Sequence, residues 1–164
     1  MAGVGTFIVE FATLSRLTGD KIYENTARKA LDSLWKSRSP INLVGNHIRV
    51  DTGKWSGVDA TIGSGVDSYF EYLVKGGILL NDPTLIKQFR DYQLAINKYL
   101  HHENWFFWAN MNTGQKTLPL FSSLEAFYPG VLTIVGNLGQ AIKLLESYHT
   151  LWRQYGCIAY FLAH

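Results

Sequence analysis

One pattern recurs along this chain of 164 residues: two helices in succession, then a short turn of the kind that joins two strands. The breaks between the paired helices fall at Gly19, Asn81 and Gly136, which are 62 and 55 residues apart. The strand turns fall at Thr52-Gly53 and Thr113-Gly114, and the third unit has no such turn. Self-similarity at this period is typical of repeat proteins, in which each unit buries its apolar surface against its neighbours. The sequence therefore predicts an all-α chain of about three helical hairpins with short β-hairpins between them.

The two helices of each unit differ in their apolar pattern. The first is apolar nearly all round in the stretches GTFIVEFATLSRLTG, VDSYFEYLVKGGILL and SSLEAFYPGVLTIVG. The second is amphipathic. Its predicted buried stripe in the third unit is Ala141, Ile142, Leu145, Tyr148, His149, Trp152 and Tyr155. A helix that is apolar all round needs cover on both sides, so we expect inner and outer helices that stack into an open solenoid or close into a toroid. Asp82 as N-cap and Pro83 at the first helical position mark the start of the second outer helix.

Composition and charge narrow the class of protein. Hydrophobic residues make up 47% of the chain and charged residues 17%, which indicates a folded domain. Fifteen Lys and Arg against thirteen Asp and Glu, with no basic block, argue against a nucleic-acid or membrane-surface partner. The chain begins without a secretory signal and has no apolar run that could span a bilayer, so we expect a cytosolic protein or an internal piece of a longer one. Cys157, the single cysteine, cannot form an internal disulfide.

Acidic residues lie in the N-terminal half of each inner helix. They are Glu10 in the first, Asp67 and Glu71 in the second, and Glu125 in the third. If the inner helices run parallel around an axis, these carboxylates gather at one end of a central cavity. Paired carboxylates in a cleft are what glycoside hydrolysis requires, one as general acid and one as general base. The alternative is that each carboxylate only favours its helix N-terminus through the helix dipole, and from spacing alone this alternative is the stronger.

Three further stretches suggest chemistry but have simpler explanations. HHE at 101–103 has adjacent histidines, which do not share a helix face, so we expect a surface helix end rather than a metal site. WFFW at 105–108 is expected to pack as a hairpin on the helix ends rather than serve as a sugar-stacking platform. GSG at 63–65 is expected to allow close backbone approach at a helix start rather than to bind phosphate.

Four stretches, in order, carry a resemblance to a known family: VEFATLSRLTGD, LVGNHIRVDTGKW, GSGVDSYFEYLVKG and SLEAFYPG. Together they resemble glycoside hydrolase family 47, the class I α-1,2-mannosidases, and most closely the ER degradation-enhancing α-mannosidase-like (EDEM) branch. The resemblance implies that residues 1–156 form part of an (α/α)7 toroid, about three of its seven hairpins. The last residues, 157–164, do not fit the family and are expected to be a divergent tail. Calcium-dependent hydrolysis of α-1,2-linked mannose with inversion, and residence in the endoplasmic reticulum lumen, are further implications of the resemblance.

The resemblance also implies roles for individual residues. Asp67 matches a catalytic carboxylate that acts as general base or positions the water. Glu10 and Glu71 match acids that line the same cavity and contact substrate, whereas a structural role is expected for Glu125. Gly65 and Ser123 stand where the processing mannosidases have an arginine and a histidine, and both differences agree with the EDEM branch.

Other parts of the family's machinery lie outside this chain. The general-acid glutamate, a second catalytic glutamate and the threonine that binds Ca²⁺ have no counterpart here, so we expect the isolated chain to be inactive and poorly soluble. The implied partners are high-mannose N-glycans on misfolded glycoproteins and an oxidoreductase. A glycan-recognition or scaffold protein without turnover is the second candidate function, and a helical-repeat scaffold unrelated to sugars is the third.

Overall fold

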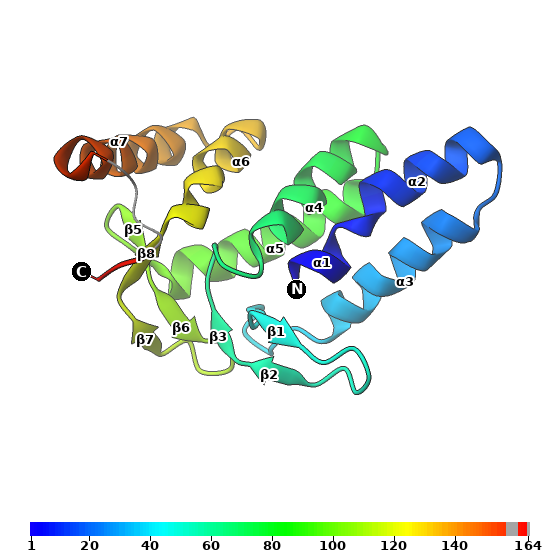
Figure 1. The fold of residues 1–164 in the computed structure, drawn as a ribbon, viewed down its shortest axis with the longest axis horizontal. Helices are drawn as coiled ribbons and strands as arrows, with labels where there is room; N and C mark the ends of the chain where they lie inside the picture. Colours follow the sequence, from blue (N-terminus) through cyan, green and yellow to red (C-terminus); the bar gives the residue numbers. More distant parts are fainter. Residues whose placement is uncertain (157–160, 164) are drawn as a thin grey trace.

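The computed structural model describes residues 1–156 and 161–163, and its helices form three successive hairpins (Figure 1). The first hairpin contains α1 (Ala2–Gly5), α2 (Phe7–Thr18) and α3 (Ile22–Lys36). The second contains α4 (Asp67–Leu79) and α5 (Pro83–Tyr99). The third contains the 3₁₀ helix η1 (Ser123–Phe127), α6 (Tyr128–Ile134) and α7 (Leu138–Tyr155). The predicted order of helices is confirmed.

The first helices of the three units form a common inner layer. Helices α1 and α2 pack against α4, and α4 packs in turn against α6 and η1. Each of α3, α5 and α7 packs on the inner helix of its own unit (Figure 1). The predicted division into inner and outer helices is therefore confirmed.

The three predicted breaks share one backbone conformation. Gly19, Asn81 and Gly136 have φ angles of 79°, 55° and 86°, in the left-handed region. Such a residue ends a helix because it turns the chain out of the helical path, and glycine or asparagine adopts it at low cost. The repeat spacing of these residues thus has a direct structural cause.

Short antiparallel strands connect the hairpins. They are β1 (His47–Ile48), β2 (Trp55–Gly57), β3 (Asp59–Ala60), β4 (His101–His102), β5 (Trp105–Phe106), β6 (Trp108–Asn110), β7 (Lys116–Leu118), β8 (Leu120–Ser122) and β9 (Phe161–Ala163). The β1–β2 and β6–β7 turns are the two predicted ones. In each, a left-handed glycine, Gly53 or Gly114, donates its N–H to the carbonyl four residues earlier at 2.8 Å. Strand β3 pairs with β6, which ties the first hairpin region to the second.

The predicted start of α5 is also confirmed. Asp82 accepts a hydrogen bond from the Thr84 N–H at 2.9 Å, and Pro83 occupies the first helical position. The second carboxylate oxygen of Asp82 lies 2.6 Å from an Arg28 nitrogen, so the cap also links α5 to α3.

Two inner helices are less regular than predicted. Thr6 leaves helical geometry, with φ −110° and ψ 6°, and separates α1 from α2. In the third unit the stretch from Ser123 to Phe127 is a 3₁₀ helix, and α6 starts at Tyr128. Pro129 has no backbone N–H to donate to the preceding turn, which favours a new helix start at this point.

The stripes predicted for the first two outer helices are buried or partly buried, but the one predicted for α7 is not. The matching residues are Tyr23, Ala27, Ala30, Leu31 and Leu34 on α3, and Leu85, Phe89, Tyr92, Ile96 and Tyr99 on α5. Ala141 and Tyr148 are buried as predicted, together with Leu144, which was not. The other predicted members are exposed: Ile142, Leu145, His149, Trp152 and Tyr155. Helix α7 is apolar on two sides and α6 covers only one of them, which explains the difference.

Apolar side chains are also exposed on the inner helices. They are Phe7, Leu14 and Leu17 on α2, Ile78 and Leu79 on α4, and Ile134 on α6. An unclosed toroid is expected to leave such surface bare. No helix in the described ranges is both long and apolar enough to cross a membrane.

The last described residues of the chain, within the expected divergent tail, add one strand to the fold. Residues 161–163 form β9, which pairs antiparallel with β8. Cys157 and the rest of 157–160 lie outside the described residues.

Candidate functional site

Asp67 is the first residue of α4 and is held by the loop that precedes it. Its backbone N–H donates to the Gly63 carbonyl at 2.9 Å, and the Val66 N–H donates to the same oxygen at 3.1 Å. The side-chain Oδ1 accepts hydrogen bonds from the Ser68 N–H at 2.8 Å and from the Ser68 hydroxyl at 3.3 Å. The carboxylate therefore has a defined orientation at the positive end of a helix dipole, which favours negative charge.

The Gly63–Gly65 loop fits tightly between the first and third units. Gly65 has a φ of 85°, and a Cβ there would lie 3.0 Å from the Asn46 carbonyl oxygen. A Cβ on Gly63 would lie 2.8 Å from Cγ of Glu125. The expected close backbone approach at this loop is confirmed, and it fixes where α4 begins.

Glu10 lies on the exposed face of α2 and contacts α4. Its Oε1 accepts a hydrogen bond from the Tyr72 hydroxyl at 2.7 Å. This bond raises the pKa of Tyr72, and the charge of Glu71 adds to the effect. Two of the three predicted site acids, Glu10 and Glu71, thus lie near one tyrosine.

Sequence reasoning missed Tyr72. Its position directly after Glu71 was visible, but its contact with Glu10 depends on how α2 and α4 are aligned along their axes. The repeat places the two helices side by side without fixing that alignment.

Glu71 lies one turn after Asp67, on the same side of α4. It pairs with Lys75, one turn further along, with Nζ and Oε1 2.5 Å apart. The Glu71 side chain is 28% exposed and that of Lys75 52%, so this pair resembles a surface i,i+4 ion pair that is worth about 0.3–0.5 kcal/mol. Among the described residues, no hydrogen bond or ion pair joins Asp67 to Glu10 or to Glu71.

Glu125 does not share the exposure of the other acids. It is fully buried, and its Oε1 accepts a hydrogen bond from the Ser122 N–H at 3.3 Å, which completes a capping box at the start of η1. Burial raises the pKa of Glu125 well above its usual range. The expected structural role of Glu125 is confirmed.

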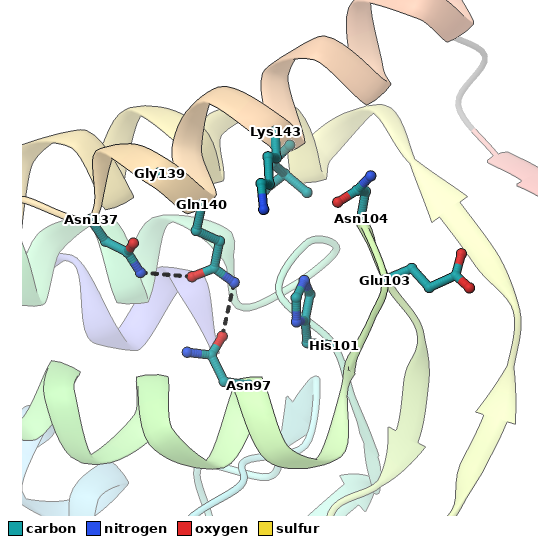
Figure 2. Close-up of a pocket in the computed structure, with 9 residues that line it drawn as sticks. Asn97, His101, Glu103, Asn104, Asn137, Gly139, Gln140 and Lys143 are labelled. Atoms are coloured by element: carbon teal, nitrogen blue, oxygen red, sulfur yellow. Dashed lines mark hydrogen bonds between the residues drawn. The ribbon is translucent and has the colours of Figure 1, made fainter.

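The cavity in Figure 2 lies away from these acids, between the end of α5 and the start of α7. Its volume is about 470 Å³, and its wall includes His101, Asn104 and Lys143. Three of its amide side chains bond to one another: Asn137 donates to Gln140 at 2.8 Å, and Gln140 donates to Asn97 at 3.1 Å.

The HHE stretch contributes His101 and Glu103 to the wall of this cavity, and WFFW follows one residue later in the sequence. His101 and His102 form strand β4 after α5 has ended at Tyr99, so the predicted helix end is wrong by two residues. The WFFW stretch packs as predicted: the Phe106 ring contacts that of Tyr128, and Trp105 contacts Tyr148, with centroids 5.2 Å and 5.8 Å apart.

Within 1–156 and 161–163, no three His, Cys, Asp or Glu side chains converge as metal ligands.

Comparison with known proteins extends these observations. The chain is 55% identical over 155 residues to the mouse protein named ER degradation-enhancing alpha-mannosidase-like protein 2, and 40% identical over 155 residues to alpha-mannosidase I MNS4 of Arabidopsis thaliana. Each alignment covers 94% of this chain, but only 27% of the mouse protein and 25% of the plant protein. The chain thus spans about a quarter of the length of the curated relatives it matches.

A solved structure also matches this chain over nearly its whole length. The alpha-1,2-mannosidase from Trichoderma reesei superposes with a TM-score of 0.79 and 25% identity, over 99% of this chain and 37% of that enzyme. The observed hairpins are therefore a segment of an (α/α) toroid, as expected. The family model for glycosyl hydrolase family 47 matches residues 1–160. This chain belongs to glycosyl hydrolase family 47.

Proposed function

We propose that this chain is the part of an inverting α-1,2-mannosidase that supplies one catalytic carboxylate, Asp67, and two substrate-binding acids, Glu10 and Glu71. The observation that carries the proposal is the placement of Asp67: it starts an inner helix and is oriented by Ser68 and the Gly63 carbonyl. Glu10 on α2 is exposed and Glu71 on α4 is partly exposed, and these two inner helices are neighbours.

In this role Asp67 acts as general base. Its Oδ2 has no hydrogen bond within the described residues and is available to a water molecule. As the water oxygen attacks the anomeric carbon, Asp67 accepts its proton and the bond to the leaving sugar breaks. The leaving oxygen takes its proton from a general acid on another segment of the toroid. Attack from the face opposite the leaving group inverts the anomeric centre.

The proposed substrates are α-1,2-linked mannose residues of high-mannose N-glycans on misfolded glycoproteins, in the endoplasmic reticulum lumen. The mouse, human and yeast relatives are all named as ER degradation-enhancing proteins, which supports the degradation context. Calcium and an oxidoreductase partner belong to the proposal through the family resemblance. The 164-residue chain alone is proposed to be inactive.

A segment exchange tests this function. The matching segment of the Arabidopsis alpha-mannosidase I is replaced by residues 1–155 of this chain, and mannose release from α-1,2-mannobiose is measured. We expect the chimera to release mannose with calcium present, Asp67→Asn to abolish release, and Glu146→Gln, an exposed control on α7, to leave release unchanged.

Two results would contradict the proposal: a folded chimera that is inactive while the unmodified host is active, or an Asp67→Asn chimera that keeps full activity. In the first case, retained binding of a high-mannose glycan by the inactive chimera would favour a glycan-recognition protein. Mannose release by the isolated chain would refute the proposed inactivity.

A further inference from the structure

The buried side chain of Glu125 touches the loop that leads into Asp67, although the two residues are 58 positions apart in the sequence. Glu125 lies at 0% exposure in η1, at the start of the third unit. Its Cγ lies so close to Gly63 that a Cβ on that glycine would come within 2.8 Å of it. Gly63 is also the residue whose carbonyl accepts the Val66 and Asp67 N–H groups.

Glu125 itself is held on its other side. Its Oε1 accepts the Ser122 N–H, and Ser122 Oγ in turn accepts the Leu124 N–H, both at 3.3 Å. Its Oε2 is buried and has no hydrogen-bond partner in the described structure, as is also true of the hydroxyls of Tyr128 and Tyr148. A carboxylate without partners in such surroundings is costly, whereas the protonated acid, which is neutral, is tolerated.

We propose that Glu125 is a positioning residue for Asp67: packed against Gly63, it fixes the carbonyl that caps α4 and so sets the place of the catalytic carboxylate. The part of this inference that concerns catalysis rests on the proposed function. Its structural part, the contact from Glu125 through Gly63 to Asp67, stands without that function.

Because Glu125 is expected to be protonated and neutral, substitution by glutamine and by alanine should have different effects. Glu125→Gln keeps the volume, the neutral state and the acceptor for the Ser122 N–H, so it should preserve the cap. Glu125→Ala removes the group that packs on Gly63. Tyr128→Phe is the matched control, because it removes an equally buried polar atom, whereas the three atoms nearest to a Cβ on Gly63 all belong to Glu125.

Amide hydrogen exchange on the complete 164-residue chain tests the structural part. We expect Glu125→Ala to accelerate exchange of the Val66 and Asp67 amides at least about 10-fold, and Glu125→Gln and Tyr128→Phe to change it less than about 2-fold. The Leu80 amide, at the other end of α4, reports on the whole helix and should change little.

Several results would overturn the proposal. These are unchanged exchange at Val66 and Asp67 in Glu125→Ala, an equal acceleration at Leu80, or the same acceleration in Glu125→Gln. A wild-type chain without protection at these two amides would also overturn it. Should Glu125→Ala not fold, Gly63→Ala disturbs the same contact with Glu125 intact, and it must accelerate exchange at the same two amides.

Turnover by the chimera tests the catalytic part. We expect Glu125→Ala to lower kcat about 10-fold or more with KM changed less than about 2-fold, and Glu125→Gln to restore kcat. A merely structural role would not separate kcat from KM in this way. If the unsubstituted chimera shows no turnover, the proposed function fails, while the exchange measurement still decides the positioning contact.

Discussion

The buried carboxyl of Glu125 should make the stability of this fold depend on pH in a predictable direction. Its pKa is raised well above the usual range, chiefly by burial. Between the pKa of the unfolded chain and the higher pKa of the folded one, the folded state binds more protons, so the free energy of unfolding falls as pH rises. In that pH range one proton corresponds to about 1.4 kcal/mol per pH unit.

The groups that face Glu125 do not change this expectation. Burial raises the pKa of both Tyr128 and Tyr148, so both hydroxyls stay neutral throughout this range. His101 acts in the opposite direction, because burial lowers its pKa and the unfolded chain then binds more protons. A comparison of wild type with Glu125→Gln cancels the His101 contribution, which is the same in both.

Urea unfolding at a series of pH values measures the effect. Relative to wild type, Glu125→Gln should become more stable as pH rises above the usual pKa of a carboxyl group, by up to about 1.4 kcal/mol per pH unit. The exposed control Glu146→Gln should run parallel to wild type. Parallel curves for wild type and Glu125→Gln would refute the reasoning, since they would mean that Glu125 ionises as readily in the folded chain as in the unfolded one.

Two further predictions concern the neighbours of Tyr69 and Glu10. Gly5→Ala should destabilise the chain by about 1–3 kcal/mol in urea unfolding, because the added Cβ would overlap the buried ring of Tyr69, whereas Gly3→Ala, whose Cβ meets open space, should not. An equal effect of the two would contradict the packing of α1 on α4. Glu10→Gln should lower the pKa of Tyr72, because it removes the charged acceptor of the hydroxyl proton; an unchanged NMR titration of Tyr72 would show that the bond does not form in solution.

Sequence patterns predicted the helical hairpins well because the residues that start and end the helices have strong local conformational preferences. The left-handed residues Gly19, Asn81 and Gly136 end the inner helices, and Asp82 followed by Pro83 starts an outer one. These preferences act within a few residues, so they can be recognised without knowing the tertiary fold.

Features that depend on the neighbouring units were harder to predict. The exposed side of α7 looked like core because Ile142 and Trp152 are apolar, and whether a helix face is covered depends on what packs against it. The 3₁₀ start of the third inner helix and the burial of Glu125 were not predicted either, because they too depend on how neighbouring units pack. The sequence spacing placed Glu125 level with Glu10 and Glu71, but spacing along a helix does not show which way a side chain points.

The positions of the candidate residues on the inner helices were predictable, but their contacts were not. Asp67 lies at a helix start as predicted, and Glu10 and Glu71 lie on neighbouring inner helices. Tyr72, which bonds to Glu10, and Gly63, which caps α4, emerge only from the register between helices that are far apart in sequence.

The most direct test of the central claim is a crystal structure of the chimera with a mannose-configured inhibitor bound. We expect the sugar ring at the N-terminal end of α4, with an Asp67 carboxylate oxygen within about 3.2 Å of the ligand or of its attacking water. Glu10 or Glu71 should contact the same sugar. A ligand bound elsewhere, for example in the cavity between α5 and α7, with Asp67 out of reach, would contradict the assignment of Asp67 as the catalytic carboxylate.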